Sequence, residues 1–195
     1  MELESNFKKY KWFFTSSGKL VVGGKSAEQN DELLKIVKKQ NNNYILMHTS
    51  EPGSPFSIIL SDVKTVKKSD IQECAIFTAS FSRAWKAGKK KTSVDIFKSA
   101  EVYKDSRMKT GTWGVLGKVE RINASLALVL TKQKGVLRAI PKESIKLDKD
   151  VIVKLFPGKI PKEDILAKIQ LETRLSLNQN ELLSALPSGG FKITK

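Results

Sequence analysis

The chain has 195 residues, 40% of them hydrophobic, and carries a formal net charge of +15 at pH 7. A chain of this length buries a hydrophobic core large enough to fold without disulfides or bound metal ions. Its single cysteine, Cys74, excludes a disulfide framework and a thiolate metal cluster. The positive charge favours a polyanionic partner such as nucleic acid, although a lysine-rich proteome would give the same charge without any binding purpose.

A hairpin and a helix are the first predicted elements. Two apolar runs at residues 10–15 and 19–22 flank Ser16-Ser17-Gly18, a pattern typical of a β-hairpin. Ser26 and Gln29 have the spacing of a capping box, which predicts a helix from there to about Lys39. Strands are then expected at 44–47 and 56–60, on either side of the turn Pro52-Gly53-Ser54-Pro55.

The centre of the chain is predicted to be a helix rich in small residues. Ser69 and Gln72 form a second capping box, so the helix should begin at Ser69 and break at Gly88. Three lysines follow the break, where the negative end of the helix dipole favours cations. From Arg83 to Arg121, eleven Lys and Arg residues oppose four acids, which places +7 of the charge in a fifth of the chain.

The remainder alternates short strands with turns. Strands are expected at 94–97, 101–104 and 112–120, with Gly114 and Gly117 marking bulges or close backbone approach. A second hairpin joins 126–130 to 136–140, and Pro141 marks a boundary. A strand at 151–156, the turn Pro157-Gly158 and helices at 161–174 and 178–186 complete the chain. We therefore predict an α+β fold with a mixed or antiparallel sheet, divided into a domain at 1–140 and a small, mostly helical appendage at 141–195.

The motifs that would indicate an enzyme are weak. Gly18 and the run Gly23-Gly24-Lys25 invite comparison with a phosphate-binding loop, but residues 19–22 should be strand where the loop would lie. The start of the helix that follows can hold a phosphate with help from Lys25, or it is a plain tight turn. His48 is the only histidine; it either hydrogen-bonds its own turn or contacts RNA. No serine has a nucleophile-elbow pattern, so we expect no enzyme, cofactor or metal.

Aromatic residues accompany the basic ones, as in proteins that stack bases of single strands. Trp85 and Phe97 are predicted to be core residues. For Tyr103 and Trp113, base stacking and core packing stay open.

The ordered motifs resemble the RNA-binding domain of the NFACT family, NFACT-R, in a stand-alone form, over about residues 10–120 and more weakly to 140. The tail from Phe156 to Ile193 is similar in style to archaeal members. The motifs are Lys11-Trp12-Phe13 with Gly18, Val22-Gly23-Gly24-Lys25, Gln29-Asn30-Asp31, His48 with Pro52-Gly53-Ser54-Pro55, Ala79-Ser80-Phe81-Ser82-Arg83-Ala84-Trp85-Lys86, and Val102-Tyr103-Lys104 with Lys109-Thr110-Gly111.

The resemblance implies a non-enzymatic RNA-binding module that engages tRNA or rRNA on the large ribosomal subunit in ribosome-associated quality control. The alternative is a DNA-binding or nucleic-acid-processing protein. No apolar run approaches the roughly 18 residues of a membrane span and no signal peptide is evident, so a cytoplasmic protein without membrane contact is expected. The predicted RNA contacts are Lys25, His48, Arg83, Lys86, Lys89, Lys90, Lys91, Lys104, Arg107, Lys109 and Trp113.

Arg83 and Lys104 are expected to matter more per residue than any one of Lys89, Lys90 and Lys91. Arg83 lies in the helix's most specific motif, and a guanidinium holds phosphate bidentately or stacks on a base. Lys104 lies in the motif Val102-Tyr103-Lys104, within the strand expected at 101–104. The alternative for Arg83 is a structural ion pair with Asp95 or Glu101.

Overall fold

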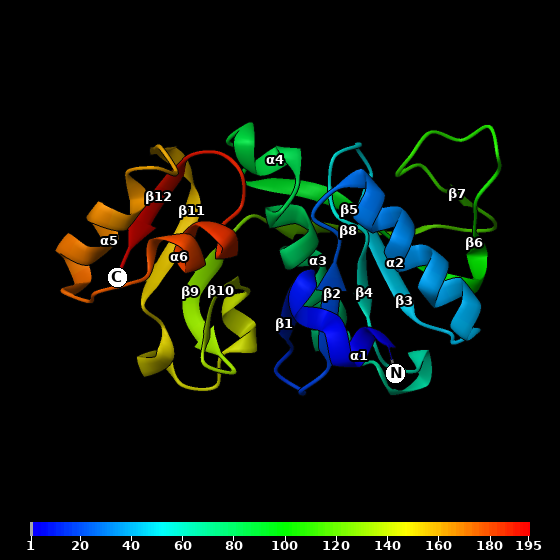
Figure 1. Cartoon of the computed structure of the whole chain (residues 1–195), viewed down its shortest axis with the longest axis horizontal. Coiled ribbons are helices and arrows are strands. Elements are labelled where there is room, and N and C mark those ends of the chain that lie inside the picture. Colours follow the sequence, from blue (N-terminus) through cyan, green and yellow to red (C-terminus); the bar gives the residue numbers. More distant parts are fainter. Residues whose placement is uncertain (1) are drawn as a thin grey trace.

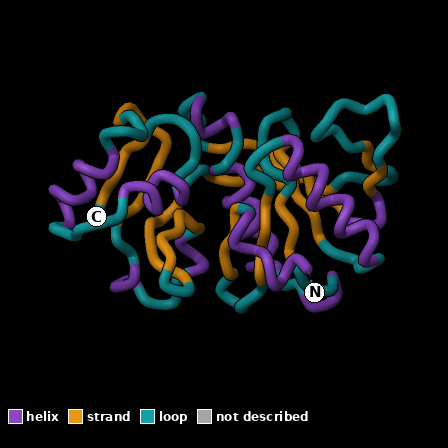
Figure 2. The backbone as a smooth tube through the Cα atoms, in the orientation of Figure 1, coloured by secondary structure: helices purple, strands orange, loops and turns teal. Residues whose placement is uncertain are grey.

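The computed structural model describes residues 2–195, which form two lobes side by side, each built on its own antiparallel sheet (Figure 1). The predicted α+β fold is confirmed, and Figure 2 shows strands in the interior of both lobes. The helices are α1 (Glu2–Asn6), α2 (Ala27–Gln40), α3 (Lys68–Ser80), α4 (Arg83–Lys86), α5 (Ile165–Thr173) and α6 (Gln179–Ala185). The strands are β1 (Lys11–Phe14), β2 (Leu20–Gly23), β3 (Ile45–Thr49), β4 (Ser57–Ile59), β5 (Lys91–Lys98), β6 (Val102–Tyr103), β7 (Gly114–Val115), β8 (Glu120–Ser125), β9 (Leu128–Gln133), β10 (Val136–Ile140), β11 (Val153–Ile160) and β12 (Phe191–Thr194).

The first lobe is a six-stranded sheet, in the order β1-β2-β4-β3-β5-β8, with a helix on each face. Successive side chains of a strand point to opposite faces. Val21 and Met47 accordingly pack into the core on the α3 side, whereas Val22 and Leu46 pack on the α2 side. Both predicted hairpins and the helix capped by Ser26, whose Oγ accepts from Gln29 N at 3.3 Å, are confirmed.

Helix α3 lies between the two sheets and is buried on every side from Glu73 onward. All residues from Glu73 to Ser80 are buried, which explains why a helix in this position is built from small and apolar residues rather than from one apolar stripe. Its apolar side chains share one continuous core with both sheets, from Phe13 of β1 to Phe191 of β12.

The start of α3 differs from the prediction. The helix begins at Lys68 after Lys67, and Asp70 supplies the cap because its Oδ2 accepts from Lys67 N at 2.9 Å. The other oxygen of Asp70 accepts from the hydroxyls of Thr15 and Ser17, both at 2.6 Å. Burial opposes ionisation of this carboxyl, but these hydrogen bonds keep the pKa of Asp70 below its usual range. The capping box at Ser69 was wrong because Asp70 has a better set of donors.

The end of α3 also differs. The helix stops at Ser80, and Trp85 lies in the separate short helix α4. Gly88, which follows α4, has a φ of +69°. The side chain of Trp85 reaches the second lobe, where its Nε1 donates to Gly190 O at 3.0 Å and its ring lies 5.7 Å from that of Phe191. Trp85 and Phe97 are 1% and 5% exposed, so their predicted place in the core is confirmed.

The second lobe is a four-stranded sheet in the order β10-β9-β11-β12, with α6 against β10 and α5 against β11. The predicted turn at Pro157-Gly158 was wrong, since both residues lie within β11 at a register shift opposite Phe191. Strand β12 was not predicted. The second sheet thus begins at β9, and the domain division at residue 140 stays a prediction.

Residues 112–120 do not form the single strand that was predicted. Only Gly114 and Val115 pair, with β6, and the long strand that follows begins at Glu120. The expected close approach at Gly114 is confirmed, because a Cβ there would lie 2.3 Å from the ring of Tyr103. The Tyr103 ring thus occupies the space that a side chain at residue 114 would need.

The lobes are also joined at the edge of the first sheet. The side-chain amide of Gln133, on β9, accepts from Phe14 N at 2.8 Å and donates to Phe14 O at 2.9 Å. Across residues 2–195, no helix has the length and apolarity that crossing a membrane requires.

Candidate nucleic-acid interface

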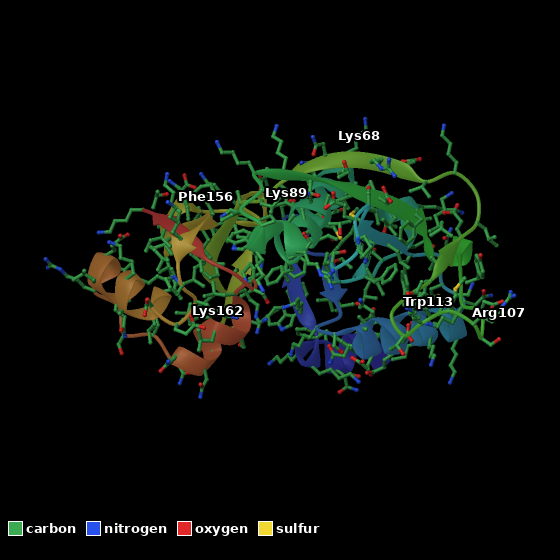
Figure 3. All side chains as sticks on the ribbon, turned by 90° about the horizontal axis from the view of Figure 1, so that it is seen from above. Lys68, Lys89, Arg107, Trp113, Phe156 and Lys162 are labelled. Atoms are coloured by element: carbon green, nitrogen blue, oxygen red, sulfur yellow. The ribbon has the colours of Figure 1, made fainter. Side chains whose placement is uncertain are left out.

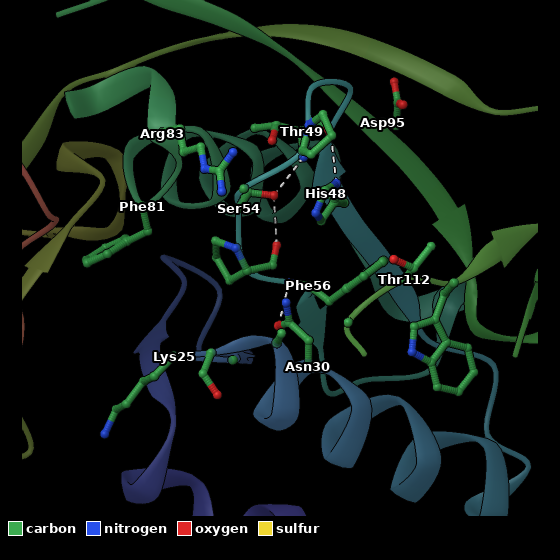
Figure 4. Close-up of a pocket in the computed structure, with 18 of the residues that line it drawn as sticks. Lys25, Asn30, His48, Thr49, Ser54, Phe56, Phe81, Arg83, Asp95 and Thr112 are labelled. Carbon is green, nitrogen blue, oxygen red and sulfur yellow. Dashed lines mark hydrogen bonds between the residues drawn. The ribbon is translucent and has the colours of Figure 1, made fainter. Parts of the chain in front are cut away.

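A cleft of about 590 Å³ opens on the first lobe where the β2–α2 loop, the β3–β4 turn, the start of α4 and the loop at 110–113 meet (Figure 4). Its lining includes Lys25, His48, Arg83 and Trp113 from the predicted RNA contacts. The remaining predicted contacts do not line it. The cleft therefore brings together four predicted residues that are far apart in the sequence.

The β3–β4 turn forms one wall of the cleft. Ser54 Oγ accepts from Thr49 N at 2.9 Å, and Thr49 Oγ1 donates to Glu51 O at 2.6 Å, which fixes the turn from inside. Gly53 has a φ of +106°, and a Cβ there would lie 2.5 Å from Arg83 Cδ. The glycine is thus required both by its backbone conformation and by the arginine that lies over it.

Arg83 is held at the edge of the cleft by its backbone. Arg83 N donates to Gly53 O at 2.9 Å, while the side chain is exposed (Figure 4). Asp95 pairs instead with Arg121, at 2.7 Å, and Glu101 Oε2 accepts from Lys98 N at 2.8 Å. Among the described residues, Arg83 forms no ion pair, so the structural alternative for this guanidinium was wrong.

His48 is partly buried beside the same turn. Its Nδ1–H donates to Thr49 O at 2.7 Å, and its ring lies 4.6 Å from that of Phe56. Burial is the main cause that lowers the pKa of His48 below its ordinary value, so the ring is neutral at pH 7 and its Nε2 is an acceptor. The structural role predicted for His48 is present, and the acceptor is available for a ligand in the cleft.

The two glycines before α2 serve packing. A Cβ at Gly24 would lie 2.2 Å from Asn30 Oδ1, and that oxygen accepts from Phe56 N at 3.0 Å across the sheet. The tight turn at the start of α2 is therefore needed for the fold. Lys25, which follows it, is exposed at the cleft, and partial burial of its ammonium together with nearby Arg138 lowers its pKa.

Lys104 lies inside the loop network that forms the far wall of the cleft. Its Nζ lies 3.1 Å from Asp31 Oδ2 on α2 and donates to Lys109 O at 2.8 Å and to Thr112 O at 3.0 Å. Asp31 also accepts from Trp113 Nε1 at 2.8 Å. Although partial burial opposes it, hydrogen bonds from Trp113 and Lys104 hold the pKa of Asp31 below its usual range. Lys104 and Asp31 thus fix the loop, and Trp113 is partly buried in a fixed position.

The other predicted cations lie elsewhere on the surface. Lys89 pairs with Glu51 at 2.9 Å, whereas Lys86, Lys90 and Lys91 are exposed. Arg107 pairs with Asp105 of its own loop, and Lys109 is exposed. Figure 3 shows Lys89 near the middle of the molecule and Arg107 at the far end of the first lobe. The assignment of these residues to RNA binding stays a prediction.

The structure adds one cation to the cleft that was not predicted as a contact. Lys11 lines it, although the sequence indicated only that this residue belongs to the motif Lys11-Trp12-Phe13. The alternation of side chains along the strand could have indicated this position. Lys11 and Phe13 share one face of β1, and that face packs against α3.

Comparisons with known proteins found one matching family, a related archaeal protein and a solved structure of similar fold. The family model described as the NFACT protein RNA binding domain matches residues 9–117, which include every residue of the cleft except Ser188. The archaeal Rqc2 homologue aRqcH of Methanocaldococcus jannaschii is 26% identical over 97% of this chain, which spans 29% of that protein's length. The C-terminal part of the fibronectin/fibrinogen-binding protein of Streptococcus suis has a similar fold, with a TM-score of 0.52 at 18% identity, covering 60% of this chain and 45% of that one.

Proposed function

The chain belongs to the NFACT protein RNA-binding domain family, and we propose from this that it is a non-enzymatic RNA-binding protein whose cleft receives the RNA. One observation carries the use of the cleft: the matched segment folds so that Lys11, Lys25 and Arg83, from three separate elements, line one opening beside the neutral His48. Cations supply affinity through phosphates, and an acceptor beside them reads a base or a ribose hydroxyl.

A finer proposal concerns the partner. We infer that the RNA is tRNA or rRNA on the large ribosomal subunit, that the protein acts in ribosome-associated quality control, and that it works in the cytoplasm. The support is the family resemblance and the archaeal relative, which bears the name of an Rqc2 homologue. The basic surface outside the cleft, including Lys90 and Lys91, would then contact further phosphates of a large assembly.

The RNA proposal is tested by competition between a structured RNA and a duplex DNA of equal charge. We expect the RNA to win. Replacing Lys89, Lys90 and Lys91 together with alanine should lower the slope of log affinity against log salt by up to roughly 2–3, because each lost phosphate contact removes about 0.7–0.9. The triple variant of Lys146, Lys149 and Lys192, exposed and outside the matched segment, changes the net charge equally and should keep the slope.

Two results would contradict this. If the DNA duplex wins, the protein is a DNA-binding or nucleic-acid-processing protein. If the slope of the lysine-run variant equals that of wild type, these three lysines belong to a solvated surface and the cleft alone supplies the phosphate contacts.

The ribosomal proposal is tested by sedimentation of purified protein with purified large subunits. We expect co-sedimentation at low salt and release as salt rises severalfold, since contacts between basic residues and phosphates are screened. Lysines between Arg83 and Lys109 should be protected from lysine-modifying reagents in the complex, while Lys192 and Lys195 should react as in the free protein. Protein that binds free RNA but stays in the supernatant with subunits would exclude ribosome docking.

A further inference from the structure

Four cations converge where the cleft reaches the second lobe. They come from four elements: Lys11 from β1, Lys25 from the β2–α2 loop, Arg138 from β10 and Lys162 from the segment before α5. Lys11 and Phe81 line both the cleft and a small pocket next to it, which Arg138 also lines. We call these four residues the junction cluster. It joins the matched segment to the part of the chain beyond residue 117.

Aromatic rings fix two of these cations in place. The Lys11 ammonium lies 4.5 Å from the centroid of the Phe81 ring, and the Arg138 guanidinium lies 4.6 Å from that of Trp12. Both rings are fixed by the core, since Trp12 is 1% exposed and Phe81 packs on Phe77. The cations are therefore held in fixed positions before any ligand binds.

Opposing carboxylates do not neutralise the cluster. Among the described residues, none of its four members forms an ion pair. The acids that face it are Glu181, on α6, and Glu163, and Glu181 already accepts from Leu137 N at 2.6 Å. The Nε of Arg138 is buried without a hydrogen-bond partner. The guanidinium is therefore held against the Trp12 ring rather than by a carboxylate.

The electrostatics agree with this geometry. Burial of the Lys11 ammonium, together with Lys162, Lys25 and Arg138 around it, lowers the pKa of Lys11 to about 8. Burial likewise lowers the pKa of Arg138 and that of Lys162. An anion placed among these groups offsets both the repulsion and the lost hydration. The start of α2 adds its partial positive charge on the same side, because Lys25, Ser26 and Ala27 line the cleft.

We infer that the junction cluster binds a phosphate group, namely a backbone phosphate of RNA lying in the cleft. A guanidinium close to an ammonium suits a tetrahedral oxyanion, which accepts from several donors at once. The cleft continues from the cluster past Arg83 to His48 and Trp113, so a chain held by its phosphate at one end can follow it. The inference rests on the proposed function, whose RNA supplies the phosphate, but free phosphate shares the chemistry.

The test compares Lys11→Met and Arg138→Met with the matched control Lys134→Met. Lys134 also lies over an aromatic ring, 5.4 Å from the centroid of Phe14, but outside the cluster. With a structured RNA, each cluster variant should bind about tenfold or more weakly, because it loses a charge-assisted hydrogen bond. Each should also lower the salt slope by about 0.7–0.9, whereas the control keeps wild-type affinity. Lys11→Arg should restore binding, since it restores the charge.

A second readout does not depend on affinity. NMR titration of the Lys11 ammonium in the wild-type chain should show its pKa rise from about 8 when RNA is added, and rise less with inorganic phosphate at the same phosphate concentration. Cluster variants that match the control, with an unmoved Lys11 pKa, would overturn the inference. A Lys11 pKa raised equally by inorganic phosphate, with RNA affinity unchanged in the variants, would assign the cluster to free phosphate and overturn the RNA assignment. Wild-type protein that binds no RNA would instead refute the proposed function. The titration with inorganic phosphate would then still show whether the junction cluster binds phosphate.

Discussion

Replacing Trp85 with alanine is expected to lower the free energy of unfolding by about 3–5 kcal/mol, the usual cost of removing a large buried aromatic side chain. Trp85 is 1% exposed and lies in the core that both sheets share. Its loss opens a cavity at the contact between α4 and Phe191. Chemical denaturation followed by circular dichroism measures the change.

The control for this variant is Trp85→Phe, which keeps most of the ring volume but loses the hydrogen bond to Gly190 O. We expect it to cost about 1–2 kcal/mol. Because the core is continuous between the lobes, wild type should unfold in a single transition. Two separate transitions would contradict this and would favour independent domains, as the division at residue 140 predicts.

Replacing Lys11 with methionine is expected to stabilise the protein by about 3 kcal/mol at pH 7, because lowering a pKa from 10.5 to about 8 costs the charged form about 1.4 kcal/mol for each pKa unit. The pKa of Lys11 is lowered from 10.5 to about 8 in the folded chain. Below pH 8 the Lys11 ammonium is charged in both the folded and the unfolded chain, so the folded chain bears the full cost of burying this charge. Between pH 8 and 10.5 the unfolded chain binds more protons than the folded one, so stability rises with pH.

The stability difference between Lys11→Met and wild type should therefore shrink to about 1 kcal/mol or less near pH 10. Thermal or denaturant unfolding at several pH values gives this difference directly, with Lys134→Met as the control. If Lys11→Met were less stable than wild type at pH 7, the ammonium would be stabilised by its surroundings, and its place in the junction cluster would be lost. A stabilising change that weakens RNA binding is the behaviour expected of a ligand site.

Local patterns were enough to predict much of the first lobe. The hairpin around Gly18 and the Ser26 cap depend on neighbours within a few residues, and both are confirmed. The predicted start of α3 was wrong because Asp70 accepts hydrogen bonds from Thr15 and Ser17, which lie more than fifty residues away in the sequence. Burial of α3 on all sides also depends on a second sheet that no local pattern places there.

The cleft shows the same limit. His48 and Arg83 were predicted and line it, since their motifs mark a turn and a helix end, and Trp113 was predicted from its place among the basic residues. The internal role of Lys104 could not be predicted, because its partner Asp31 lies 73 residues away. Arg138 was missed for a similar reason: alone in β10 it resembles a surface residue, and only the packing against Trp12 buries its Nε.

The amide of Gln133 has a consequence for the behaviour of the protein at high concentration. Strand β1 is the outer strand of its sheet, and the N–H and C=O of Phe14 face away from β2, where a strand of another molecule would pair with them. Gln133 occupies both groups with one side chain, as a peptide unit of a seventh strand would. The sheet is thereby closed to growth at this point, and the hydrophobic run Trp12-Phe13-Phe14 is kept from seeding aggregates edge to edge.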